Sequence, residues 1–190
     1  MYTYLIKVEN VSKQFNDIKV INDISVNIEP GKVYLLLGEN GSGKSTFIKM
    51  LLKLYAPSEG QITTYYKDFR YVPELLPIKS DIKVLTYIKA ICNLRNIKRN
   101  LEMELDLELD LNKQLRHLSK GNLKKVLIYL AVIGTPEILF LDEPLDGLDQ
   151  VMQKKVLNYF KQIPDATLII STHDKSKFKS FQNKEVITFG

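Results

Sequence analysis

Residues 38–46 of the chain read Gly-Glu-Asn-Gly-Ser-Gly-Lys-Ser-Thr, which fits the phosphate-binding pattern G-x-x-x-x-G-K-[ST]. A short apolar run at 33–37 precedes the motif and helix-forming residues follow at 47–54, so we expect a buried strand, a loop and a helix in this order. Glycines allow a tight turn in which several backbone N–H groups converge on phosphate oxygens, and the helix N-terminus adds partial positive charge. A chance match is the alternative, and the flanking strand and helix argue against it.

Two side chains of this loop have predicted chemical roles. Lys44 is placed to reach the β- and γ-phosphates of a nucleoside triphosphate during catalysis, and the Ser45 hydroxyl is placed to ligate Mg²⁺. Further contacts to the nucleotide are expected from the rest of the loop and from the start of the helix, at Asn40, Gly41, Ser42, Gly43 and Thr46.

A second stretch, 138–143, reads Ile-Leu-Phe-Leu-Asp-Glu and predicts a buried strand that carries two carboxylates at its C-terminal end. Ligands of parallel α/β sheets bind at that end. Asp142 is expected to hold Mg²⁺, and Glu143 to accept a proton from the attacking water or to orient it. Pro144 favours an extended backbone at Glu143. Solvated acids at an ordinary strand end are the alternative, but one mechanism requires both this strand and the Lys44 loop.

The pentapeptide Leu-Ser-Lys-Gly-Asn at 118–122 opens a helical run, about twenty residues before the acidic strand end. With this third motif the chain resembles the nucleotide-binding subunit of an ATP-binding cassette (ABC) transporter. The family's pentapeptide is usually Leu-Ser-Gly-Gly-Gln, so Lys120 and Asn122 are departures. The resemblance implies that Ser119 and Gly121 cap the γ-phosphate of an ATP held by the opposite subunit. It therefore implies a homodimer, or a pair with a related subunit, that encloses two ATP molecules with Mg²⁺.

The resemblance extends to other residues and covers essentially the whole chain. Phe15 occupies the place of the family's adenine-stacking aromatic, and a core or hairpin aromatic is an equal alternative. Asp149 matches the acid of the family's D-loop, which lies at the subunit contact. His173 follows the apolar strand 168–170 and matches the switch histidine that contacts the γ-phosphate.

Glu74 is a further departure, because the family places a glutamine after the aromatic-hydrophobic-proline stretch that reads Tyr71-Val72-Pro73 here. A carboxylate at this position is able to coordinate Mg²⁺ or bind water, and we include Glu74 among the predicted metal ligands. It also adds negative charge beside a triphosphate. Either the site tolerates this charge or Glu74 swings away until the site closes.

The resemblance implies an α/β fold: a P-loop NTPase core with a parallel central sheet, an N-terminal antiparallel β subdomain, and an α-helical insertion at about 76–134. One such domain over 1–190 suits the length. Alternation predicts antiparallel strands at 2–8 and 19–28, and residues 81–97 have helical periodicity. Residues 101–111 alternate like a strand although their residue types favour helix, and we expect irregular to helical structure there.

Composition limits the partners. The net charge is +5, from 27 basic and 22 acidic residues, with no basic run, so we expect no nucleic-acid partner. The single cysteine excludes an internal disulfide and fits a reducing cytosol. The longest apolar stretch, 126–133, is far shorter than the roughly twenty residues that span a bilayer. Transport therefore requires a separate polytopic membrane subunit, with this chain at the cytoplasmic face of the membrane.

Two classes of function remain open. The first is the ATPase subunit of a membrane exporter, with a peptide, a bacteriocin or a drug as cargo. The second is a cytosolic ABC ATPase that acts on a soluble scaffold, such as iron–sulfur cluster assembly. Ribosome-acting members carry two cassettes in one chain, and repair-type members carry a long coiled coil; neither feature fits 190 residues without sustained heptads. The compact chain favours the exporter.

Overall fold

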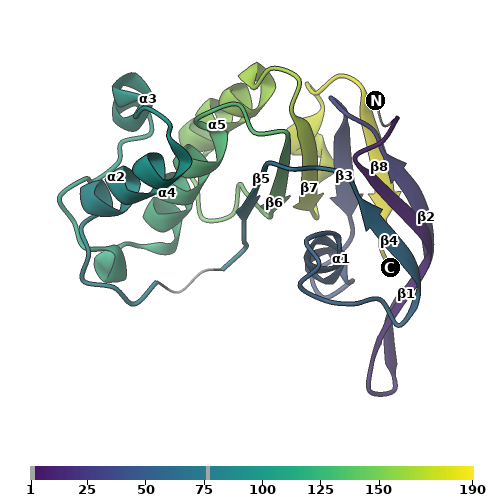
Figure 1. The fold of residues 1–190 in the computed structure, drawn as a ribbon. Coiled ribbons are helices and arrows are strands. Elements are labelled where there is room, and N and C mark those ends of the chain that lie inside the picture. Colours follow the sequence, from purple (N-terminus) through teal and green to yellow (C-terminus); the bar gives the residue numbers. More distant parts are fainter. Residues whose placement is uncertain (1–2, 76–77) are drawn as a thin grey trace.

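The computed structural model describes residues 3–75 and 78–190 and contains two β-sheets with helices packed around them (Figure 1). The strands are β1 (Ile6–Phe15), β2 (Ile18–Ile28), β3 (Val33–Leu37), β4 (Glu59–Thr64), β5 (Phe69–Val72), β6 (Ile138–Asp142), β7 (Thr167–Thr172) and β8 (Lys184–Thr188). The helices are α1 (Lys44–Leu51), α2 (Val84–Arg95), α3 (Leu101–Asp106), α4 (Lys120–Val132) and α5 (Gln150–Gln162), with 3₁₀ turns at Leu115–His117 and Lys175–Phe178.

The central sheet has the strand order β5-β6-β7-β3-β8, and its neighbouring strands pair in parallel. Because β7 lies between β3 and β6, the carboxyl ends of these three strands meet at one edge. Leu37 pairs with Thr172 there, and Asp142 pairs with Ser171. A separate antiparallel sheet has the order β2-β1-β4. The expected fold class, an α/β core with an antiparallel β subdomain, is confirmed.

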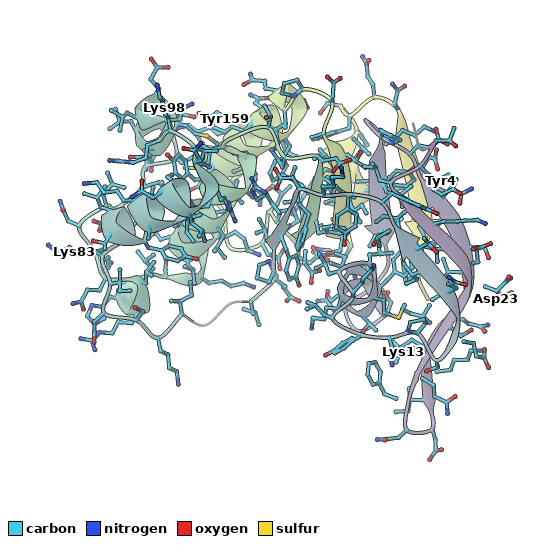
Figure 2. All side chains as sticks on the ribbon, viewed as in Figure 1. Tyr4, Lys13, Asp23, Lys83, Lys98 and Tyr159 are labelled. Atoms are coloured by element: carbon cyan, nitrogen blue, oxygen red, sulfur yellow. The ribbon has the colours of Figure 1, made fainter. Side chains whose placement is uncertain are left out.

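The inner strands β3, β6 and β7 are buried on both faces, as their continuous apolar runs predicted, whereas the edge strands β5 and β8 are partly exposed. Alternate residues point to opposite sides of the sheet. One face, with Leu35 and Leu141, packs against the helices α2 to α5, and the other, with Tyr34 and Phe140, packs against α1 and the antiparallel sheet. Side chains fill the space on both sides of the sheet (Figure 2). The carboxyl edge of the sheet is therefore held rigidly from two directions.

The helices α2, α3 and α4 lie between β5 and β6, within the range expected for the helical insertion. Their apolar side chains, such as Ile88 and Tyr129, belong to the same buried cluster as Val72 and Leu141 of the sheet. Tyr159, labelled in Figure 2, reaches from α5 to α3, and its hydroxyl donates a 2.8 Å hydrogen bond to Asp106. The helical region is thus continuous with the core on one face of the sheet.

Local structure differs from the sequence expectations in several places. The first strand starts at Ile6 and continues to Phe15, beyond the expected end, because β1 pairs with both β2 and β4. In the ambiguous stretch, α3 covers Leu101–Asp106, with Asn100 accepting a hydrogen bond from the Met103 N–H at its start. Helix propensity therefore prevailed over strand-like alternation. Within the described residues, the structure holds no helix of the length and apolarity that a membrane span requires.

Glu104 ties α3 to α4 through a buried ionic cluster. Its side chain is 3% exposed and accepts hydrogen bonds from the Arg99 guanidinium and, at 2.7 Å, from the Tyr129 hydroxyl. Burial raises the pKa of the Glu104 carboxyl, but the bonds from Arg99 and Tyr129 outweigh burial and hold the pKa below its usual value. Stability from this group is therefore present above pH about 4.3 and is lost as the pH falls through the lowered pKa.

We expect Glu104→Gln to lower the free energy of unfolding at pH 7 by about 1–3 kcal/mol, because the variant loses a buried, charge-assisted pair of hydrogen bonds. The difference from the wild type should shrink below pH about 4.3, because the carboxyl of the unfolded wild-type chain takes up a proton there, and should vanish as the pH falls through the lowered pKa of the native carboxyl. Urea unfolding at pH 7 and at pH 3.5 measures both effects. Glu102→Gln is the control, since Glu102 is exposed on the same helix. Equal destabilisation by the two substitutions would contradict the assignment.

Candidate nucleotide-binding and hydrolytic site

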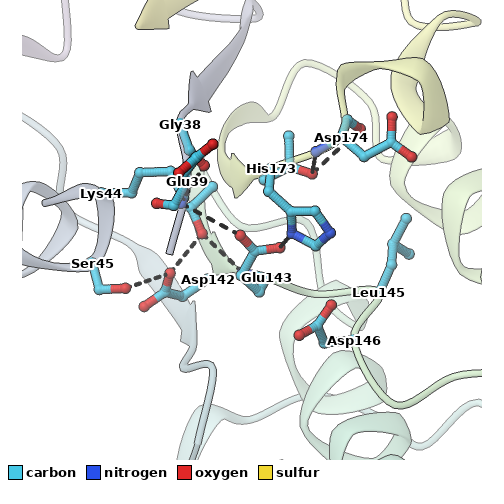
Figure 3. Close-up of polar contacts among 12 residues, drawn as sticks. Gly38, Glu39, Lys44, Ser45, Asp142, Glu143, Leu145, Asp146, His173 and Asp174 are labelled. Atoms are coloured by element: carbon cyan, nitrogen blue, oxygen red, sulfur yellow. Dashed lines mark hydrogen bonds and ion pairs between the residues drawn. The ribbon is translucent and has the colours of Figure 1, made fainter. Parts of the chain in front are cut away.

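The Lys44 loop joins β3 to α1, as the sequence predicted. Gly43 directly precedes α1 with φ +102°, a left-handed conformation that favours glycine. A β-carbon added there would lie 2.8 Å from the backbone oxygen of Val20, so the loop also requires the absence of a side chain. Lys44 is 5% exposed, and its ammonium donates hydrogen bonds to the backbone oxygens of Gly38 at 2.7 Å and Glu39 at 2.8 Å (Figure 3). The lysine therefore lies over the loop, with its charge turned toward the strand edge.

The Asp142 carboxylate joins three elements of the site. Its Oδ1 accepts a 3.0 Å hydrogen bond from the Ser45 hydroxyl of α1 and a 2.6 Å hydrogen bond from the Ser171 hydroxyl of β7 (Figure 3). Asp142 is 2% exposed. Two of the three predicted Mg²⁺ ligands, Ser45 and Asp142, thus lie side by side, and both offer the hard oxygen atoms that Mg²⁺ prefers. These residues fit the cation.

Glu143 is buried between two potential cations. Its Oε1 lies 3.7 Å from the Lys44 ammonium and its Oε2 lies 3.3 Å from His173 Nδ1 (Figure 3). The pKa of the Glu143 carboxyl is raised, chiefly by burial, against the opposing influence of His173 and Lys44. A raised pKa makes this carboxylate a better proton acceptor, which suits the role of a general base.

The expected extended backbone at Glu143 is wrong. Its φ is +43°, in the left-handed region. The strand ends in a tight turn, in which the Asp146 N–H donates to the Glu143 oxygen at 3.2 Å, and the Glu143 N–H donates to the Ser171 hydroxyl at 2.9 Å. These bonds outweigh the local preference that Pro144 imposes. The turn still keeps the side chain outside any helix.

A cavity of about 230 Å³ at the carboxyl edge of the sheet, the phosphate-loop cavity, contains most of the residues that we predicted to contact the nucleotide. It is lined by Val20, Asn40, Gly41, Gly43, Lys44, Ser45, Thr46, Glu74 and Glu143. The structure therefore brings Glu74 to the same cavity as Lys44 and Glu143. Phe15 does not line this cavity: it lies at the end of the β1–β2 hairpin, where its ring packs edge-on against Tyr55, 5.6 Å between centroids. Its contact with adenine stays a prediction.

The pentapeptide and D-loop residues lie elsewhere. Ser119 precedes α4 and accepts a hydrogen bond from the Asn122 N–H, and Asp149 precedes α5 and accepts one from the Met152 N–H. Gly121 packs closely against Gly147 of its own chain, which belongs to the D-loop segment 145–149. A β-carbon added to Gly121 would lie 2.3 Å from the backbone oxygen of Gly147. A glycine is therefore required here by packing within one chain.

Glu143, Asp146 and His173 bring ligand atoms within 4.8 Å of one another. Lys44 lies 3.7 Å from Glu143, and Lys120 lies 3.9 Å from Asp146. These cations compensate the carboxylates and oppose a second metal ion here.

Lys124 is a site residue that sequence reasoning missed. It is 2% exposed, and its ammonium contacts the backbone oxygens of Pro73 at 2.9 Å, Glu74 at 3.1 Å, and Asp142 and Glu143 at 3.3 Å each. Burial, with a smaller contribution from Lys120, lowers the pKa of Lys124 to about 8. Lys125 follows it directly, and two adjacent lysines on a helix are typical of a solvent-exposed face. Nothing in the sequence alone indicates that Lys124 is buried.

Comparisons with known proteins agree with this geometry. A family model described as ABC transporter matches residues 21–146. An uncharacterized ABC transporter ATP-binding protein of Methanocaldococcus jannaschii is 33% identical over 96% of this chain and 73% of its own length. The chain belongs to the ABC transporter family and is a nucleotide-binding ATPase subunit of it.

Solved structures show the same fold at lower identity. The ATP-binding subunit of an ABC transporter superposes with a TM-score of 0.84 at 23% identity, over 97% of this chain and 88% of that one. An archaeal ribosome recycling factor, solved with a ribosomal stalk protein, superposes with a TM-score of 0.79 at 24% identity, over 90% of this chain but 34% of that one. The fold therefore occurs in proteins with different partners.

The arrangement fits one half of a phosphoryl-transfer site. The loop N–H groups and Lys44 would hold the phosphates, and Ser45 and Asp142 would hold the metal. Mg²⁺ bound there would supply the positive charge that neutralises the charge developing on the transferred phosphate. Glu143, at the cavity wall, would take or orient the proton of the attacking water, and His173 would hold the carboxylate from the other side.

We expect Glu143→Gln to keep ATP binding and to cut turnover about 10²–10⁴-fold, the usual effect of losing a positioned base. Lys44→Ala should instead weaken ATP binding by about 10–100-fold, since it removes a charged donor to phosphate. Steady-state phosphate release and nucleotide titration separate the two effects. Near-normal turnover of Glu143→Gln would sink the assignment of Glu143.

Proposed function

We propose that the chain is the Mg²⁺-dependent ATP-hydrolysing subunit that powers a membrane ABC exporter of peptide, bacteriocin or drug. The observation that carries the proposal is the buried Glu143 carboxylate, which lies 3.7 Å from the Lys44 ammonium at the wall of the phosphate-loop cavity. That position suits a base acting on water beside a γ-phosphate. The chain would lie at the cytoplasmic face of the membrane, bound to a separate polytopic subunit.

Hydrolysis would require two chains. Ser119 and Gly121 are not among the described residues that line the phosphate-loop cavity of their own chain. A head-to-tail arrangement about a two-fold axis would bring them to the ATP of the other chain, with Asp149 near the contact. Ser119 is exposed at the start of α4, where a hydroxyl and a helix N-terminus suit a phosphate.

With ATP bound, the Glu143→Gln protein should elute as a dimer and the nucleotide-free protein as a monomer, because ATP would complete the interface and the variant would not hydrolyse it. Size-exclusion chromatography with light scattering measures the mass of each form. Ser119→Asp serves as the matched disruption: its carboxylate should repel the phosphate and prevent the dimer while the monomer still binds ATP. A monomer at saturating ATP and micromolar Glu143→Gln protein would count heavily against the two-chain site.

The membrane subunit has a candidate docking groove. A cavity of about 340 Å³ next to Glu74 is lined mainly by apolar side chains, from Leu75, Ile78, Leu115, Leu118, Leu123 and Leu127. Leu75 is 64% exposed at this groove, so its apolar side chain is accessible to a partner. Leu76, which we also expected to take part, lies outside the described residues. A short helix of the membrane subunit would fill the groove, so that ATP-driven movement at Glu74 reaches the transporter.

Leu75→Asp should abolish co-purification with the membrane subunit while basal ATPase activity stays near normal, because the charge enters the groove and not the nucleotide site. Glu74→Gln should keep co-purification and change how strongly the partner stimulates turnover. Leu94→Asp is the control, since Leu94 is 82% exposed on α2 and outside the groove.

A purified partner without membrane-spanning segments would favour the alternative, a cytosolic ATPase of iron–sulfur cluster assembly. Unfolding of Leu75→Asp would show that Leu75 supports the fold, and would contradict its assignment to docking.

A further inference from the structure

Lys124 is a buried lysine, 2% exposed, and charged side chains are rarely buried so completely. Removing an ammonium from water costs several kcal/mol unless other groups replace its hydration. At Lys124 that replacement comes from backbone oxygens of two separate segments, 73–74 and 142–143. Three ammonium hydrogens shared among four oxygens bind the segments to each other through one side chain. These segments carry Glu74 and Glu143, two side chains at the wall of the phosphate-loop cavity.

The bonds from Lys124 act on a backbone that needs support. The left-handed φ of Glu143, +43°, is unfavourable for a residue with a β-carbon. Ser171 holds the Glu143 N–H at 2.9 Å, and Lys124 holds the Glu143 oxygen at 3.3 Å. The two peptide groups that flank the α-carbon are therefore both fixed. Because they set the direction of the Cα–Cβ bond, they also set where the carboxylate lies.

We infer that Lys124 is a positioning residue for ATP hydrolysis: its ammonium fixes the backbone of Glu143, and with it the carboxylate that faces the attacking water. The inference rests on the proposed function, in which Glu143 is the base. Lys124 bonds only backbone oxygens, those of Asp142 and Glu74 among them. The Asp142 carboxylate is held separately by the Ser45 and Ser171 hydroxyls, so removal of Lys124 should leave the metal- and phosphate-binding groups in place. A misplacement of a reacting group by about 1 Å costs roughly 10²-fold in rate.

The same helix supplies a matched control. Lys125 is also buried, at 8% exposure, and its ammonium donates a 3.1 Å hydrogen bond to the backbone oxygen of Glu108, in the helical region. Methionine keeps an unbranched side chain that is one atom shorter than lysine and removes every donor. Comparison of Lys124→Met with Lys125→Met therefore separates the loss of a buried lysine in general from the loss of the bonds at Glu143.

We expect Lys124→Met to lower the kcat of ATP hydrolysis about 10–100-fold and to leave the Kd for ATP within about twofold, whereas Lys125→Met keeps both within about twofold. Phosphate release and nucleotide titration of the full chain measure these quantities, with thermal unfolding followed for each variant. Equal kcat values for the two variants, or a parallel loss of ATP affinity in Lys124→Met, would overturn the inference. Should Lys124→Met fail to fold, Lys124→Gln, which keeps two donors, is judged by the same criteria.

A double-mutant cycle with Glu143→Gln gives a readout that general destabilisation does not move. If Lys124 acts through Glu143, adding Lys124→Met to the Glu143→Gln protein should change the residual turnover by less than about threefold. A further drop as large as in the wild-type background would show independent action and overturn the inference. Near-normal turnover of Glu143→Gln alone overturns the role of Glu143 itself, which distinguishes failure of the proposed function from failure of this inference.

Discussion

The paired hydrogen bonds to Asp142 Oδ1 are the contact on which the rest of the site depends. Ser45 reaches this oxygen from the start of α1 and Ser171 from β7, although the three residues are far apart in the sequence. The contact requires β6 and β7 to keep their register, with Asp142 opposite Ser171. It also requires the phosphate loop to return α1 to the sheet edge. A shift of one residue in either strand would turn these side chains to the other face of the sheet.

The core on both sides of the sheet provides the rigidity for this contact. Each face of β3, β6 and β7 packs into its own apolar cluster, so the strands have little freedom to slide or tilt. Burial also has an electrostatic consequence, because it strengthens the interaction of Glu143 with Lys44 and His173 and raises the pKa of the Glu143 carboxyl. The apolar residues of the strands thus hold the polar groups in place and also tune them.

The sequence predicted those parts of the site that follow from local patterns. The phosphate loop, the acidic strand end and His173 each lie in a short segment whose glycines, apolar run or strand end point to its structure, and the fold places them together. Lys124, Ser171 and the left-handed turn at Glu143 were missed for a common reason. Each depends on a partner in another segment, such as the Glu143 N–H for Ser171. The residues adjacent in the sequence do not indicate which distant segment will supply that partner.

Helix α4 connects the D-loop, the carboxyl edge of the sheet and the helical region, which the proposed ATP-driven movement would have to couple. Its 13 residues span about 20 Å. Near its start, Gly121 packs against the D-loop. Three residues later, the Lys124 ammonium bonds the backbone oxygens of Asp142 and Glu143. In the last turns, the Tyr129 hydroxyl donates a hydrogen bond to Glu104 of α3. A helix this short moves as one body, since bending it would break its own hydrogen bonds. In the proposed two-chain arrangement, a force from the second chain on the N-terminus of α4 would therefore reach the Glu143 backbone and the helical region together.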